Sequence, residues 1–271
     1  IDERNERAFV MSERIIPIFL SSGVKLKYID LIIDILGEPL PIMMHYSMFL
    51  YTIQTLCSEE QQSKWIPQCI NGTILGAYAQ TEMGWGSDLN SLETTATLCG
   101  KEWILNTPSD RAVKVWPGGL AGPKTTHAIV VAQVSGRITM FIVDLRSAGV
   151  TRGSVGFLMG FNGAANGWVR FTNVRVPVEN ALPAQPKHKL YGTMVNTRTR
   201  IIRSSFFSLA KAVTIAHAYA KVRQQPRGTK IIEHKHIQTT LTKWTCFAEK
   251  LGTYDGTSSE IALKAFVTDE V

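Results

Sequence analysis

The sequence has few cysteines and no long apolar run. It contains four cysteines in 271 residues, and no two of them form a Cys-x-x-Cys pair; they are Cys57, Cys69, Cys99 and Cys246. This spacing excludes a disulfide framework and a cysteine-based zinc site, and it predicts reduced thiols in an intracellular compartment. No apolar segment reaches the roughly 18 residues that a membrane-spanning helix needs, so we expect no membrane span.

The beginning of the sequence also lacks familiar features. The chain starts Ile1-Asp2-Glu3-Arg4, with neither an initiator Met nor a signal-peptide pattern, and we therefore expect a piece of a longer protein. Hydrophobic residues make up 45% and charged residues 19%, which excludes an intrinsically disordered chain. The length allows one large domain or two to three smaller ones.

Acidic residues are scarce between Pro186 and Lys250. This segment has thirteen Lys and Arg against two acids, in a chain of net charge +7. Such a segment attracts polyanions, namely nucleic acid, an anionic membrane or a phosphate-bearing cofactor, unless it is simply a solvated basic face. Because aromatic residues are not interleaved with the charges, the pattern does not favour nucleic acid.

Three regions differ in residue pattern. Residues 1–75 and 188–271 carry apolar residues at helical spacing, whereas residues 76–187 contain short β-branched runs bounded by Gly, Pro and Asp. We therefore predict an α+β protein of several domains. These are an N-terminal helical domain (1–75), a middle β-barrel or β-sandwich domain (76–187) and the incomplete start of a C-terminal helical bundle (188–271).

Local signals predict several boundaries within these regions. Ser58, followed by acidic residues, predicts the N-cap of a helix, and Ser135-Gly136 predicts a two-residue hairpin turn. Residues 167–176 alternate like a strand, with the period slipping near Asn173. A long helix is expected to end near Gln225, and another to span about residues 237–251. The apolar stripe of the long helix consists of Phe206, Leu209, Ala210, Val213, Ala216 and Ala220.

Two glycine-containing motifs are candidates for ligand binding. In residues 78–88 a strand is expected to end at Thr81, and a loop with two glycines and the Ser87 hydroxyl follows. Its Gly-x-Gly lacks the spacing of a dinucleotide fingerprint, so by itself it indicates only a turn-rich loop. The second motif is Trp116-Pro117-Gly118-Gly119. Its Trp could pack against a planar cofactor, or it could be a buried anchor at a tight turn, and the residues alone favour the anchor.

Six ordered motifs together resemble a known family. They are GAYAQTEMGWGS (76–87), LETTAT (92–97), ILNTP (104–108), WPGG (116–119), HAIVVAQ (127–133) and YGTMV (191–195). In order and spacing they are similar to the peroxisomal acyl-CoA oxidases of the acyl-CoA dehydrogenase superfamily, from about Pro39 to Gln225. The resemblance implies the acyl-CoA dehydrogenase-like order of a helical domain, a β domain and a helical bundle.

The resemblance also implies an FAD site, with flavin and substrate contacts. In the first of the six motifs it places Tyr78, Ala79, Gln80 and Thr81 along the edge of the flavin ring, with the Thr81 hydroxyl on the side of flavin N5. Gly86 and Ser87 match loop positions near the flavin and the phosphate-bearing arm of the substrate, and Gly118 matches a second flavin contact. Donors there favour the reduced ring, which gains more from hydrogen bonds than the oxidised one.

The basic segment contributes further matches. Arg198 corresponds to a substrate-side arginine, and Arg223 resembles an arginine that contacts the flavin pyrophosphate across a subunit interface, a role suited to the guanidinium fork. A flavin-contacting Gln corresponds either to Lys235 or to Gln238, and the choice stays open. A metal site at His234-Lys235-His236 is not expected, because carboxylates and cysteines are missing.

The sequence departs from the family at two places. Trp85 stands where family members usually carry His, and it either narrows the substrate pocket or is a core anchor. The family's catalytic base is a Glu in a Glu-Gly context late in the C-terminal bundle, and no Glu of this chain can be assigned to it.

The reaction implied by the resemblance is the FAD-dependent oxidation of fatty acyl-CoA to 2-trans-enoyl-CoA, with O2 reduced to hydrogen peroxide, as in fatty acid β-oxidation. The resemblance also implies a homodimer with flavin near the subunit interface, a peroxisomal location, and no binding of nucleic acid. Two alternatives stay open: an acyl-CoA dehydrogenase that uses an electron-transfer partner, and a non-catalytic structural or binding member of the family.

Overall fold

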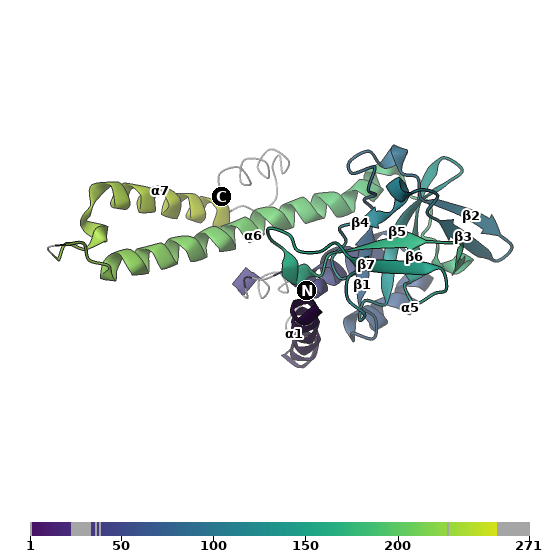
Figure 1. The fold of residues 1–271 in the computed structure, drawn as a ribbon, viewed down its shortest axis with the longest axis horizontal. Coiled ribbons are helices and arrows are strands. Elements are labelled where there is room, and N and C mark those ends of the chain that lie inside the picture. Colours follow the sequence, from purple (N-terminus) through teal and green to yellow (C-terminus); the bar gives the residue numbers. More distant parts are fainter. Residues whose placement is uncertain (1, 23–33, 36, 38, 227, 254–271) are drawn as a thin grey trace. The chain divides into compact units, whose positions relative to one another are not determined.

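The computed structural model describes residues 2–22, 34–35, 37, 39–226 and 228–253 (Figure 1). The chain forms two compact units, one of residues 1–29 and 38–193 and the other of residues 30–37 and 194–271. The order of helical, β and helical segments agrees with the predicted fold class. The division into three domains at residues 75 and 187 stays a prediction. Within the described residues, no helix is long and apolar enough to cross a membrane.

Helices form the beginning of the first unit. They are α1 (Asp2–Ser22), α3 (Pro41–Met44), the π-helical segment η2 (His45–Phe49), α4 (Leu50–Leu56) and α5 (Glu59–Ile70). Helix α5 begins at a capping box, in which the Ser58 hydroxyl accepts a hydrogen bond from Gln61 N and the Gln61 side chain accepts one from Ser58 N. The prediction that Ser58 caps this helix is confirmed.

The strands that follow form two sheets within the described residues. The six-stranded sheet contains β1 (Gly76–Ala79), β5 (His127–Val134), β2 (Thr95–Cys99), β3 (Glu102–Asn106) and β9 (Val174–Pro177) in this order, with β6 (Arg137–Asp144) paired to β5. The three-stranded sheet has the order β4 (Lys114–Val115), β8 (Gly167–Phe171) and β7 (Val150–Ser154). Apolar side chains of both sheets share one buried cluster, which includes Leu105, Phe141 and Phe171.

Two turns in these sheets test the sequence predictions. Ser135 and Gly136 both have positive φ, and they join β5 to β6 as a hairpin, which confirms that prediction. Residues 167–176 are not one strand with a slipped period. They form β8 and β9, which lie in different sheets on either side of a turn at Asn173, whose φ is +50°. The change of sheet explains why the alternation breaks there.

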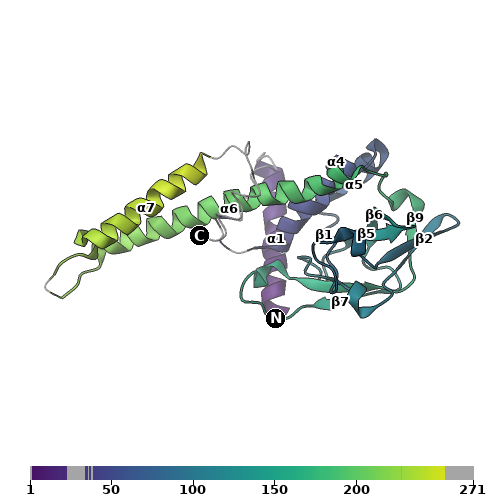
Figure 2. The same ribbon diagram turned by 90° about the horizontal axis from the view of Figure 1, so that it is seen from above.

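The second unit contains a helical hairpin. Helix α6 (Lys187–Val222) begins before this unit, and α7 (Lys235–Gly252) runs antiparallel beside it (Figures 1 and 2). Between them, Leu209, Ala248 and Leu251 are buried together with parts of neighbouring aromatic side chains. The turn after α6 contains Gly228 at φ +81°, so the expected end of the long helix and the expected second helix are both confirmed. Ala216, which we expected on the apolar stripe, is exposed.

Candidate functional site

The end of β1 is held in place by the helices before it. The backbone N–H of Gly76 donates to His45 Nδ1 at 2.9 Å, and His45 Nε2 donates to the Cys69 carbonyl at 3.0 Å. A Cβ at Gly76 would lie 2.1 Å from the Phe49 ring, so only glycine allows this close approach. Burial lowers the pKa of His45 to about 4, which keeps the ring neutral in this arrangement.

Along β1, the predicted contacts Tyr78 and Ala79 have buried side chains. The Tyr78 hydroxyl donates to Gln80 Oε1 at 3.2 Å, and burial raises the pKa of Tyr78. Gln80 and Thr81, which follow the strand, are half-buried. The strand thus ends two residues before the predicted end at Thr81, and the residues that follow it, Gln80 and Thr81, are more accessible than the strand itself.

The structure brings the two glycine-containing motifs together. Val115 N donates to the Thr81 carbonyl at 3.0 Å, Met83 N donates to the Val113 carbonyl at 2.9 Å, and Glu82 forms a β-bridge with Lys114. As a result, the end of β1 lies beside β4 and the Trp116 turn, although these segments are far apart in the sequence.

Trp116 is not the buried anchor that the sequence alone favoured. Its side chain is 54% exposed, and its φ is +81°, a conformation that is costly for a bulky residue. Backbone hydrogen bonds hold this turn in place instead: Trp116 N donates to the Gly167 carbonyl, and Gly167 N donates to the Pro117 carbonyl. Strained residues of this kind are concentrated at ligand sites, and an exposed indole offers a flat apolar wall.

The glycines that follow Trp116 allow close packing against the segment before β8. Gly119 N donates to the Ala164 carbonyl at 2.8 Å. A Cβ at Gly118 would lie 3.2 Å from that same carbonyl oxygen. At Gly119, φ is +87° and a Cβ would lie 2.8 Å from Thr125 Oγ1. Gly118 is thus buried under the turn, where its packing role is explained without a ligand.

The loop after β1 has glycines of two kinds. A Cβ at Gly84 would lie 3.0 Å from the Arg111 side chain, and Gly84 N donates to the Arg111 carbonyl, so packing explains this glycine. At Gly86 a Cβ would meet nothing within 4 Å, and both Gly86 and Ser87 are exposed. Residues 86–87 therefore leave open space beside the loop.

Trp85 is fastened to the outer part of this loop. Its indole Nε1–H donates to Glu93 Oε1 at 2.9 Å, and the Arg111 guanidinium lies 4.8 Å from the ring centroid. Hydrogen bonds from Ser109 and Trp85, together with the nearby Arg111 charge, hold the pKa of Glu93 below its usual range. The side chain is only half-buried, so it is not a core anchor. A pocket-narrowing role stays a prediction.

Sequence reasoning missed a buried ion pair at the centre of this region. Lys114 Nζ lies 2.9 Å from Glu82 Oε1, and both side chains are 0% exposed. Burial lowers the pKa of Lys114 to about 8, while the Glu82 carboxylate acts in the opposite direction. One feature of the sequence could have predicted the buried lysine: Lys114 lies inside the apolar run Ala112–Trp116, two residues before the tryptophan.

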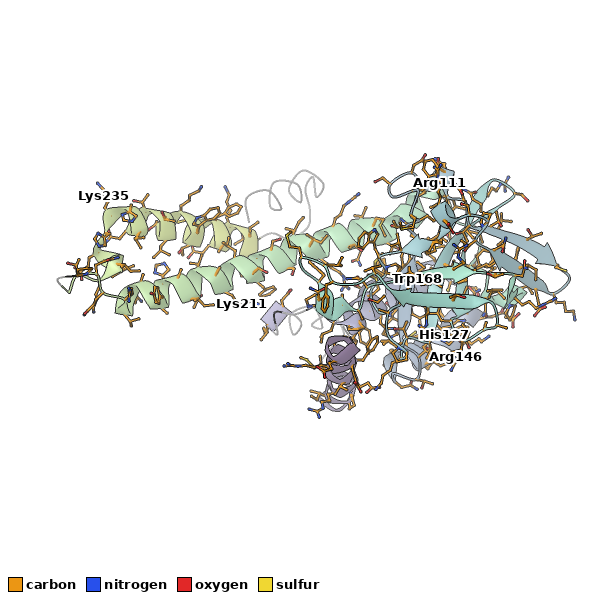
Figure 3. The ribbon with its side chains drawn as sticks, viewed as in Figure 1. Arg111, His127, Arg146, Trp168, Lys211 and Lys235 are labelled. Carbon is orange, nitrogen blue, oxygen red and sulfur yellow. The ribbon has the colours of Figure 1, made fainter. Side chains whose placement is uncertain are left out.

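The remaining predicted contacts belong to the second unit. Arg198 is half-buried on α6. Arg223 directly follows α6 and is exposed, and its carbonyl accepts a hydrogen bond from Ile231 N at 3.0 Å. Lys235 and Gln238 are exposed in the first turns of α7, near the turn that joins the two helices (Figure 3). Arg223 and the beginning of α7 are thus brought to the same end of the hairpin, and Arg198 lies further back along α6.

Metal-ligand residues do not gather in the described part of the chain, where no group of three His, Cys, Asp or Glu has a metal-binding arrangement.

Known families match almost the whole chain. Residues 2–75 match the family described as acyl-coenzyme A oxidase N-terminal, residues 77–174 match the acyl-CoA dehydrogenase middle domain, and residues 191–251 match the acyl-CoA oxidase C-alpha1 domain.

Curated relatives give the same result. Acyl-coenzyme A oxidase 1 of Drosophila melanogaster is 39% identical over 218 residues, covering 70% of this chain and 32% of the relative. Peroxisomal acyl-coenzyme A oxidase 1 of Mus musculus is 41% identical over 212 residues, covering 68% of this chain and 32% of the relative. The chain therefore spans about a third of the length of these relatives.

Solved structures agree in fold. Acyl-CoA oxidase 1 of Arabidopsis thaliana has a TM-score of 0.83 at 31% identity, with 99% of this chain and 45% of that chain covered. Acyl-CoA oxidase-1 of Caenorhabditis elegans, complexed with FAD and ATP, has a TM-score of 0.79 at 29% identity, with 91% of this chain and 42% of that chain covered. Matched from its N-terminal helices to α7, the chain belongs to the acyl-CoA oxidase family.

Proposed function

We propose that the protein carrying this chain is an FAD-dependent acyl-CoA oxidase. It converts fatty acyl-CoA to 2-trans-enoyl-CoA and reduces O2 to hydrogen peroxide, and it works in peroxisomal β-oxidation. The observation that carries the proposal is the meeting of the end of β1 with the exposed, strained Trp116. The names of the relatives and the FAD bound in one of them support the same activity.

The residues of the first unit fit a flavin. Trp116 offers a flat wall, and Gly86 leaves space that no neighbouring atom fills. Within the part of the chain that the structure describes, no group bonds the Thr81 hydroxyl, so it is available as a donor. When bound, FAD supplies a two-electron acceptor. Thr81 orients the ring by a hydrogen bond at its N5 edge. The other predicted flavin contacts of this unit support the residues that touch the ring; they are Tyr78, Ala79, Gln80 and Gly118.

The exposed polar residues fit the phosphate-bearing parts of cofactor and substrate. Ser87 donates its hydroxyl to the substrate's phosphate-bearing arm, and Arg198 is a substrate contact. Arg223 binds the flavin pyrophosphate of a partner subunit in a homodimer, with Gln238 or Lys235 as an additional contact. Arg223 suits this role because it is exposed beside a turn that also carries Lys230.

Removal of the substrate's α-proton requires a carboxylate base. Glu82 cannot serve, because Glu93 N, Thr94 N and Lys114 Nζ already bond both of its oxygens in a fully buried position. We assign no Glu of this chain as the base. This chain's part in the proposed reaction is to bind and orient cofactor and substrate.

The full-length protein tests the proposal directly. Purified protein should be yellow with bound flavin, should release peroxide when given a saturated acyl-CoA and air, and should reoxidise rapidly when the reduced form meets air-saturated buffer. Slow reoxidation together with reduction of an electron-transfer partner would replace the oxidase by a dehydrogenase. Colourless protein that binds no added FAD would make it a non-catalytic member of the family.

A further inference from the structure

The Glu82–Lys114 pair is buried at an energetic cost that needs a reason. Its two side chains are 0% exposed and 2.9 Å apart, and Lys114 is among the largest fully buried side chains of the described residues. Desolvation of two charges commonly cancels their attraction, so apolar residues of the same volume would stabilise the fold equally well or better. The pair therefore has little value as a stabilising contact alone.

The hydrogen bonds of the pair connect three segments. The Glu82 carboxylate accepts from Glu93 N at 2.7 Å and from Thr94 N at 2.9 Å. Lys114 Nζ, in turn, donates to the carbonyl oxygen of Gln80 at 3.0 Å. The carboxylate thus holds the ammonium group in place, and the ammonium group holds the peptide that enters Thr81.

This arrangement fixes Thr81 from both sides. Lys114 Nζ bonds the carbonyl before Thr81, and Val115 N bonds the carbonyl of Thr81 itself at 3.0 Å. Because a trans peptide points its C=O and N–H in opposite directions, the Thr81 N–H must point away from Lys114. With both flanking peptide planes held by neighbouring residues of β4, the φ and ψ of Thr81, and hence the direction of its side chain, have little freedom.

We propose that Glu82 and Lys114 are positioning residues that aim the Thr81 backbone N–H and hydroxyl at the flavin edge. This inference rests on the proposed FAD-dependent function. A lysine is suited to the task because its long stem reaches a carbonyl on the neighbouring segment, whereas an apolar residue fills the same volume and leaves that carbonyl unheld. Donors held in advance stabilise the reduced ring without reorganisation.

The test uses the double variant Glu82→Gln/Lys114→Met in the full-length protein. The matched control is Glu13→Gln/Lys124→Met, which removes an exposed ion pair of the same unit, with 2.6 Å between Lys124 Nζ and Glu13 Oε2. We expect the double variant to fold, to bind FAD at least tenfold more weakly and to hold bound flavin at a more negative reduction potential. The control should leave the melting temperature, FAD affinity and potential unchanged.

Two results would overturn the inference. One is a double variant whose melting temperature falls while FAD affinity and flavin potential match the wild type, which would make the pair structural only. If the double variant does not fold, Glu82→Gln alone decides, because it keeps the side-chain volume: unchanged affinity and potential in that folded variant contradict positioning. Absence of FAD binding by the wild type itself would instead defeat the proposed function.

Discussion

Two charged clusters border the loop of residues 82–88, and they differ in exposure. Glu82 and Lys114 are fully buried, and backbone and ammonium groups engage both carboxylate oxygens. Arg111 and Glu93 are 62% and 31% exposed, with 3.7 Å between Arg111 Nε and Glu93 Oε1, and they hold Trp85 from the solvent side. The buried pair controls the position of the backbone at Thr81, whereas the exposed pair attaches one side chain of the loop. The two ion pairs have different roles because water screens the exposed Arg111–Glu93 pair but not the buried Glu82–Lys114 pair.

The largest effect is expected from breaking the buried pair on one side. Lys114→Met leaves the Glu82 carboxylate buried without its cation, and this should lower the free energy of unfolding by about 3–5 kcal/mol. Chemical denaturation of the variant and wild type measures the difference. Arg111→Met, the matched change in the exposed cluster, should have a much smaller effect. Equal losses for the two variants would contradict the comparison.

A pH titration extends the comparison to a buried neutral group. His45 has a pKa of about 4 in the folded protein, below the ordinary value of 6.5, because burial disfavours its charged form. The unfolded chain therefore binds a proton that the folded chain does not, and stability must fall as the pH falls from 6.5 to 4. At about 1.4 kcal/mol per pH unit the total loss is about 3 kcal/mol.

The control for this titration is His45→Gln, which cannot become charged. Melting temperatures measured from pH 7 to pH 4 should decrease more steeply for the wild type than for this variant. Parallel curves would show that His45 contributes nothing to the acid sensitivity, and would leave other groups to explain it.

An exposed cation should matter for binding and little for folding. Arg223→Ala removes the proposed contact to the flavin pyrophosphate, so FAD affinity should fall by about ten- to a hundredfold while the melting temperature stays close to that of the wild type. Flavin retained after dialysis measures the effect, with Lys243→Ala, a change to an exposed lysine on α7, as the control. Unchanged flavin content would remove Arg223 from the site.

A small loss of stability is expected at Trp85. Trp85→His removes the indole N–H that donates to Glu93 and the ring that lies beneath Arg111, and both contacts are partly screened by water. The melting temperature should therefore decrease much less than it does in Lys114→Met, and flavin should stay bound. If the indole narrows the pocket, chain-length preference should change by ~1–3 kcal/mol per discriminated methylene. Wild-type stability together with wild-type kinetics on every chain length would show that Trp85 neither stabilises the loop nor narrows the pocket.

Much of the fold followed from local patterns in the sequence. Ser58 with Gln61 determines where α5 begins, Ser135-Gly136 determines a hairpin, and residues after Val222 end the long helix. These features depend on interactions between neighbours in the chain, so residue order suffices to predict them. Asn173 shows where such patterns fail, because the alternation on either side of it does not reveal that the two strands belong to different sheets.

The sequence by itself determined the family, the order of helical and β segments, and the motifs that supply the candidate site. The tertiary structure decided how these motifs are used. It turned Trp116 outward, because hydrogen bonds from the backbone to residues 164–167 hold the turn without the indole. It also paired Glu82 with Lys114, which residue spacing could not predict, since burial of a charge depends on which distant segments the sheets bring together.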